Sequence, residues 1–141
     1  MSRILSSMGC ALALSFAASA VCADVVVVVS QQSPVTTLSR TQLTDIYLGR
    51  MSRFPNGEPV VPIDQKEGTD ARAAFYRDYL GQSPAQIKAH WSKLIFTGRG
   101  QPPRSVEDGA AMAEFIAEHP KAIGYTDSDY ITSDVRIVSI E

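Results

Sequence analysis

The sequence has very few cysteines and histidines. Its two cysteines, Cys10 and Cys22, fall within the first 23 of 141 residues, and its two histidines, His90 and His119, are far apart. No HExxH, HxH or CxxC spacing is present, so the residue pattern of a zinc site is missing. No serine stands in the GxSxG pattern of a hydrolase. We therefore expect no metal ion, no other cofactor and no enzymatic activity.

Residues 1–23 have the composition of a secretory signal peptide. Arg3 precedes an apolar stretch, and the small residues Val21 and Ala23 fit positions minus three and minus one of a cleavage site. The apolar stretch is too short and too rich in Ala and Ser to span a bilayer stably. We expect cleavage before Asp24, export to the periplasm, and no insertion in the membrane after cleavage.

Residues 24–141 are predicted to form one domain. This part contains no cysteine, so no disulfide can stabilise it, but a chain of this size buries roughly two thirds of its unfolded surface and can build its own core. It carries 12 Lys and Arg against 15 Asp and Glu, a net charge of −3. Such a charge gives no general attraction to nucleic acid, so any anion site has to be local.

Predicted strands alternate with predicted helices along this part of the chain. The unbroken run Val25–Val29 is typical of a strand that is buried on both faces. Further strands are expected near residues 60–63, 122–125 and 135–140. Helices are expected after the cap Ser39, from Asp70 to Leu80, from Ser83-Pro84, and after the caps Ser105 and Asp108, with an exposed loop over 97–103. This alternation predicts an α/β fold with a mixed, mostly parallel sheet and helices on both faces.

The predicted helices each have an apolar face. These faces are Leu43, Ile46 and Tyr47; then Ala71, Ala74, Phe75 and Tyr79; then Ile87, Trp91, Leu94 and Ile95; and last Met112, Phe115 and Ile116.

The segment Glu67-Gly68-Thr69-Asp70 is the strongest candidate for a ligand site. Glycine lets a backbone approach a ligand, threonine offers a hydroxyl, and Arg72 in the first turn could donate to an anion. Two alternatives stay open here. In the first, the segment is an oxyanion site. In the second, Thr69 or Asp70 only caps the helix, and the negative charges of Glu67 and Asp70 cancel the positive potential that an anion would need.

Several short motifs occur in the order found in one known family. They are Leu43-Thr44-Asp45-Ile46-Tyr47-Leu48-Gly49-Arg50, Phe54-Pro55-Asn56-Gly57, Gly68-Thr69 through Phe75, His90-Trp91, and Lys121-Ala122-Ile123-Gly124-Tyr125. From about Asp24 to Ile140 the chain resembles the phosphate-binding-protein-like family, the periplasmic substrate-binding components of phosphate ABC transporters. The resemblance implies a non-enzymatic binding protein whose ligand is phosphate or a related oxyanion.

The chain departs from that family in its anion motif and in its size. Glu67 stands where the family has a serine, and residues 63–66 lack the family's arginine, although Lys66 is present. Residues 24–141 also suffice for only one of the family's two lobes. We therefore expect a single lobe that binds its oxyanion weakly, or one that serves as an interaction module for an envelope protein or for a second copy.

Overall fold

A computed structural model describes residues 24–141, and the predicted signal peptide lies outside the described residues. The valine run forms β1 (Val25–Ser30), in which Val27, Val28 and Val29 are wholly buried. Consecutive side chains of a strand point to opposite faces, so both faces of β1 are covered. The prediction of a doubly buried strand is confirmed.

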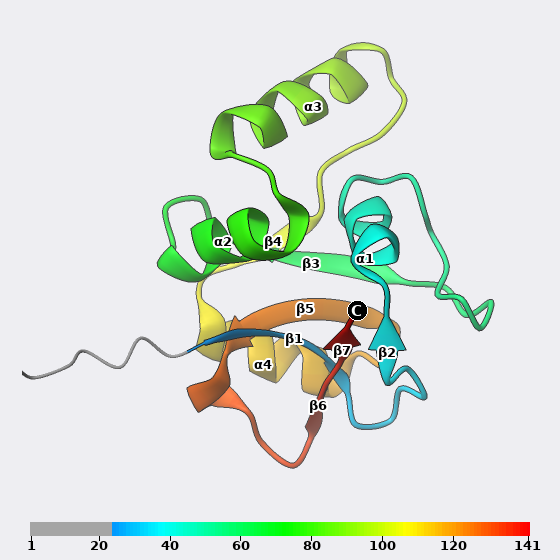
Figure 1. Ribbon diagram of the computed structural model, residues 1–141, viewed down its shortest axis with the longest axis vertical. Helices are drawn as coiled ribbons and strands as arrows, with labels where there is room; N and C mark the ends of the chain where they lie inside the picture. Colours follow the sequence, from blue (N-terminus) through cyan, green and yellow to red (C-terminus); the bar gives the residue numbers. More distant parts are fainter. Residues whose placement is uncertain (1–23) are drawn as a thin grey trace, which may run out of the picture.

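Five strands form one sheet in the order β4-β3-β5-β1-β6 (Figure 1). The other strands of this sheet are β3 (Val61–Gln65), β4 (Arg104–Val106), β5 (Ala122–Asp127) and β6 (Val135–Ile137). β3 is parallel to β4 and β5, whereas β1 is antiparallel to both β5 and β6. Within this sheet β1 therefore runs opposite to all the other strands. A small parallel pair joins β2 (Thr37–Leu38) to β7 (Ser139–Ile140).

Helices cover both faces of the sheet, as predicted. On one face lie α1 (Arg40–Tyr47), α2 (Asp70–Phe75) and the π-helical turn η1 (Tyr76–Leu80) that continues α2; on the other lies α4 (Gly109–Glu118). A 3-10 turn, η2 (Ser128–Tyr130), follows β5. None of the helices within residues 24–141 has the length and apolar character needed to cross a bilayer.

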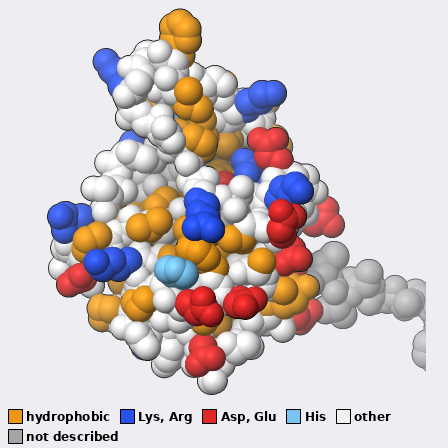
Figure 2. Space-filling model, turned by 180° about the vertical axis from the view of Figure 1, so that it is seen from behind, with side chains coloured by type: hydrophobic (Ala, Val, Ile, Leu, Met, Phe, Trp, Pro, Cys, Tyr) orange, Lys and Arg blue, Asp and Glu red, His pale blue; other side chains and the backbone are white. Residues whose placement is uncertain are grey.

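Helix α3 (Pro84–Phe96) projects from the body of the molecule (Figures 1 and 2). Its start is fixed by a capping box, in which Ser83 accepts from the backbone of Gln86 and the Gln86 side chain accepts from the backbone of Ser83. Only its residues Ile87 and Trp91 are buried, whereas Ile95 is 55% exposed and Phe96 is 93% exposed. The prediction that Ile95 belongs to a buried face is wrong, because the end of α3 extends beyond the core.

One further prediction of an element boundary is wrong. Ser105 does not cap a helix, because it lies in β4 and pairs with Asp64 of β3; Asp108 alone caps α4. The predicted helix from Asp70 to Leu80 is confirmed in its bounds, but it is α-helical only to Phe75 and π-helical from Tyr76 to Leu80.

An aromatic cluster lies between β5 and the helices of the α1–α2 face. The rings of Phe75 and Tyr125 are stacked with their centroids 3.9 Å apart, and the edge of Tyr47 meets Phe75 at 4.8 Å. Tyr76 packs against the same group, with its ring 5.4 Å from Phe75. These rings pack the end of α2 and the first residue of η1 against β5, the strand beside β3, and so fix α2 on the sheet next to the candidate site.

Candidate functional site

A cavity of about 420 Å³ opens between the start of α2 and the N-terminal half of α3. All five residues of the predicted site line it: Glu67, Gly68, Thr69, Asp70 and Arg72. Other lining residues include Tyr76, Pro84, Ile87 and Lys88.

Thr69 is the N-cap of α2. Its Oγ1 accepts a hydrogen bond from the backbone N–H of Arg72 at 3.3 Å, and Gly68 before it has a φ of 91°, which favours glycine. Asp70 is the first helical residue. The Thr69 hydroxyl proton can still be donated to a ligand, because the capping bond uses the oxygen only as an acceptor. Since α2 has only six α-helical residues, its backbone dipoles contribute a small field.

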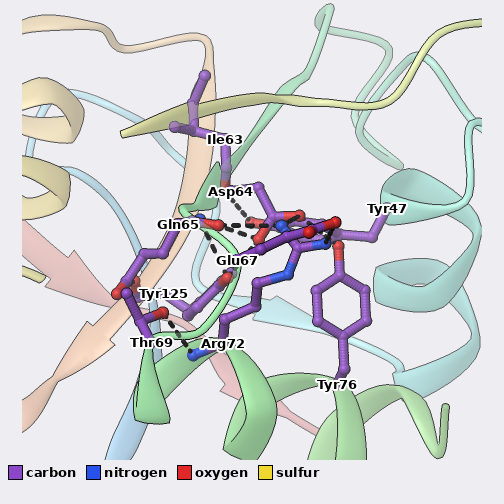
Figure 3. A network of polar contacts seen from close by, with 9 residues as sticks. All are labelled: Tyr47, Ile63, Asp64, Gln65, Glu67, Thr69, Arg72, Tyr76 and Tyr125. Carbon is purple, nitrogen blue, oxygen red and sulfur yellow. Dashed lines mark hydrogen bonds and ion pairs between the residues drawn. The ribbon is translucent and has the colours of Figure 1, made fainter. Parts of the chain in front are cut away.

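Arg72 reaches back towards β3, but its guanidinium already has partners (Figure 3). Its Nη1 donates to the carbonyl oxygen of Gln65 at 3.0 Å and lies 3.4 Å from Oδ2 of Asp64. Its Nη2 lies 4.0 Å from Oε1 of Glu67, and the guanidinium sits 5.3 Å from the centre of the Tyr76 ring. The side chain is 20% exposed, so it contacts both the buried network and the cavity. Glu67, in contrast, is an exposed counter-ion that an incoming anion would have to displace or tolerate.

The buried carboxylate of Asp64 is the centre of the network in Figure 3. The Tyr76 hydroxyl donates to its Oδ2 at 2.5 Å, the Tyr125 hydroxyl donates to Oδ1, and the backbone N–H of Gln65 donates to Oδ1 at 2.9 Å. Arg72 adds the ion pair to Oδ2. Both oxygens of this buried carboxylate therefore have polar partners, as a buried polar group requires.

The tyrosines around Asp64 are held in their protonated form. Burial, followed by the negative charge of Asp64 and the hydrogen bond to it, raises the pKa of both Tyr76 and Tyr125 far above the ordinary tyrosine value. Burial also raises the pKa of Tyr47, whose hydroxyl donates to the carbonyl oxygens of Ile63 and Ile123. All three hydroxyls therefore act as fixed donors.

The side chains that line the cavity balance in charge. Glu67 and Asp70 contribute two carboxylates, whereas Arg72 and Lys88 contribute two cations. Lys66, which the sequence offered as a substitute for the missing arginine, lies 3.4 Å from Glu107 on the surface. The cavity therefore has positive groups but no net positive charge.

Sequence reasoning did not identify several residues that shape this site. Asp64 follows the apolar residues at the end of β3, and a charge at that place was a signal that could have been used. Lys88 reaches the cavity from a different helix, and no local pattern indicates this contact.

The side chains of both histidines contact carbonyl oxygens of the backbone. The ring Nε2 of His90 lies 2.9 Å from the carbonyl oxygen of Leu48, and Nδ1 of His119 lies 2.7 Å from that of Phe115. Across residues 24–141, no group of three His, Cys, Asp or Glu side chains is arranged to hold a metal ion.

Comparison with known proteins gives a clear result for the fold. The sequence matches no protein-family model and no curated protein. Its structure is similar to a protein from Clostridium perfringens assigned to the phosphate ABC transporter substrate-binding proteins and solved with bound phosphate, with a TM-score of 0.65 and 18% identity over 82% of this chain. It is also similar to an ABC-type phosphate transport receptor of Vibrio cholerae, with a TM-score of 0.59 and 17% identity over 82% of this chain. A third similar structure is PstS of Borrelia burgdorferi, with a TM-score of 0.63 and 13% identity over 83% of this chain.

The chain spans less than half of the length of these proteins. The matched regions are 44% of the Clostridium chain, 45% of the Vibrio chain and 47% of the Borrelia chain. At these identities the likeness shows the fold, which is that of one lobe of a phosphate-binding protein, and confirms the fold class predicted from the sequence. The first two neighbours are binding proteins of transporters rather than enzymes.

Proposed function

We propose that the protein is an exported, non-enzymatic solute-binding protein whose cavity between α2 and α3 takes a small oxyanion, with phosphate as the first candidate. The observation that carries this proposal is the meeting of Arg72, Lys88 and the Thr69 hydroxyl at one cavity. The fold adds support, because a structural neighbour was solved with bound phosphate. Its predicted signal peptide would deliver the chain to the periplasm.

The proposed binding is weak. Nη1 of Arg72 is committed to Gln65 and Asp64, so Nη2 and Lys88 supply most of the available charge. The cavity is lined by exposed groups such as Glu67, so a bound anion stays partly in water, where each charged contact contributes little. The carboxylate of Glu67, 4.0 Å from Nη2, competes with the ligand for the same guanidinium.

Calorimetric titration with inorganic phosphate tests the proposal. We expect weak binding to the wild type and binding about tenfold tighter to Glu67→Ser, because removing one like charge at this range is worth about 1 kcal/mol or more. Glu58→Ser is the matched control, because Glu58 is also exposed and does not line the cavity; it should bind as the wild type does.

Two results would reject transport-type binding of phosphate. One is the absence of heat with wild type and Glu67→Ser alike. The other is binding gained only in Glu67→Ser, which would mean that the natural cavity excludes the anion.

A second function has a specific observation in its favour. The internal pairing of Arg72 with Asp64 withdraws charge from the cavity, while the projecting α3 exposes large apolar side chains at its end. Both features fit an interaction module of the cell envelope that keeps the lobe as a scaffold. The second rejecting result above would favour this function.

A further inference from the structure

The end of α3 is an exposed apolar surface with basic neighbours. Phe96 is 93% exposed and Ile95 is 55% exposed, and the view in Figure 2 shows apolar side chains at the extremity of the projecting part. We call Lys93, Ile95, Phe96 and Arg99 the α3 tip. Residues 84–103 contain Lys88, Lys93 and Arg99 but no Asp or Glu. The α3 tip is thus apolar in its centre and positive around it.

A surface of the opposite character lies on α4. A groove of about 560 Å³ runs between α4 and residues 129–134. Alanines at 110, 113 and 117 contribute apolar walls, and the acidic side chains that line it are Glu114, Glu118, Asp129 and Asp134. Among the described residues that line it, none is Lys or Arg. We call this surface the α4 groove.

We infer that the α3 tip of one copy of this chain docks in the α4 groove of a second copy. Phe96 would enter between the alanines, which leave space because they have the smallest apolar side chains. Lys93 and Arg99 would then face the carboxylates of the rim. Apolar contact in the centre with paired charges at the rim is the usual anatomy of a protein interface.

The geometry requires two chains. Helix α3 projects at one end of the molecule, whereas α4 lies across the sheet from it (Figure 1), so one copy cannot fill its own groove. Because the two docking surfaces differ, the contact is heterologous, and each added copy leaves one free tip and one free groove. Association of this kind continues with concentration or closes into a ring. It should weaken as salt rises, because the rim charges are exposed.

Sedimentation velocity over a concentration series tests the inference with protein expressed from the full-length sequence. We expect the wild type to associate as its concentration rises, and Phe96→Ser and Ala110→Arg each to stay monomeric. Val61→Ser is the control, since Val61 is 50% exposed and belongs to neither surface; it should associate as the wild type does. Thermal unfolding of each variant reports whether it is folded.

Mixing the two variants gives the decisive measurement. Phe96→Ser keeps its groove and Ala110→Arg keeps its tip, so an equimolar mixture should form a 1:1 complex and nothing larger. The charge pair Lys93→Glu and Glu114→Lys repeats the test without changing the apolar contact: each alone should weaken association, and their mixture should restore it.

Three outcomes would overturn the inference. The wild type could remain monomeric at every concentration. The tip variants could abolish association while the groove variants do not, which would mean that two tips meet each other. Folded tip and groove variants could also both be monomeric and fail to combine.

Discussion

The side chain of Asp64 in β3 binds Arg72 of α2, Tyr76 of η1 and Tyr125 of β5. Replacing it with alanine leaves the hydroxyls of Tyr76 and Tyr125 without their acceptor and removes the buried ion-pair partner of Arg72, whose guanidinium keeps its hydrogen bond to the carbonyl oxygen of Gln65. We expect Asp64→Ala to lower the free energy of unfolding by about 3–5 kcal/mol, the usual cost of breaking a buried ion pair. Urea unfolding followed by circular dichroism measures it.

The control for this prediction is Asp78→Ala. Asp78 also pairs with an arginine, Arg77 at 2.8 Å, but on an exposed surface. Equal losses of stability in the two variants would contradict the structural role of Asp64.

The buried tyrosines predict a loss of stability in alkaline solution. Burial raises the pKa of Tyr47, Tyr76 and Tyr125 above 10.0, the value at which each would titrate in the unfolded chain. Below that pH neither state loses these protons, so they do not change stability. Above it the unfolded state releases protons first, and the free energy of unfolding should fall as pH rises further.

Urea unfolding at a series of pH values between about 9 and about 12 measures this loss. Tyr125→Phe should show a shallower fall than the wild type, because one titrating group is removed. A flat profile across this range would contradict the prediction.

At the scale of the residue, the sequence predicts the part of the cavity lining between Glu67 and Arg72, but not how these groups are paired and not the contribution of Lys88. Glu67 through Arg72 are adjacent in the chain, and a helix start keeps them adjacent in space. The ion pair between Arg72 and Asp64 depends on how α2 packs on the sheet, for example through the stacking of Phe75 on Tyr125. Lys88 depends on the position of a whole helix. Neither contact is encoded in a local pattern.

Gly124 allows α4 to pack closely on β5. A Cβ at this position would lie 2.4 Å from the sulfur of Met112 and 3.1 Å from two carbons of Ile116. We expect Gly124→Ala to destabilise the fold by about 1–3 kcal/mol, because the added methyl overpacks a filled core. Thermal or urea unfolding measures the change.

Gly100→Ala is the matched control for this element-scale prediction. A Cβ at Gly100 has its nearest neighbour at 3.8 Å, in ordinary contact with Trp91. If both substitutions were equally tolerated, the close packing of α4 on β5 would not limit the choice of residue at 124.

The π-helical turn η1 explains why the second helix was only partly predicted. Periodicity correctly indicated a helix with Ala71 and Phe75 buried, but Tyr76 and Leu80 are buried as well. The wider turn of a π-helix, with i→i+5 bonding such as that from the backbone N–H of Gly81 to the carbonyl oxygen of Tyr76, lets these neighbours share one side. The hydrogen bond from the Tyr76 hydroxyl to Asp64 stabilises the π-helical turn.

For the whole molecule, the alternation of strands and helices was enough to predict an α/β fold with covered faces. The direction of β1 could not be predicted in the same way. A run of valines indicates a strand that is buried on both faces, whether that strand is parallel or antiparallel to its neighbours. The pairing of Val25 with Asp127 joins residues that are far apart in the sequence, so no local pattern indicates it.

The position of β1 between β5 and β6 has a consequence for folding during synthesis. β1 is the first strand of the described chain to be synthesised, yet its two neighbours, β5 and β6, are among the last. Until residues 122–137 have emerged, the five valines have no strand to pair with, and a sheet built from such distant pairs closes slowly. The five-stranded sheet therefore cannot be completed before the last sixth of the chain has been synthesised, and a chain that completes its sheet so late is compatible with the proposed export in an unfolded state.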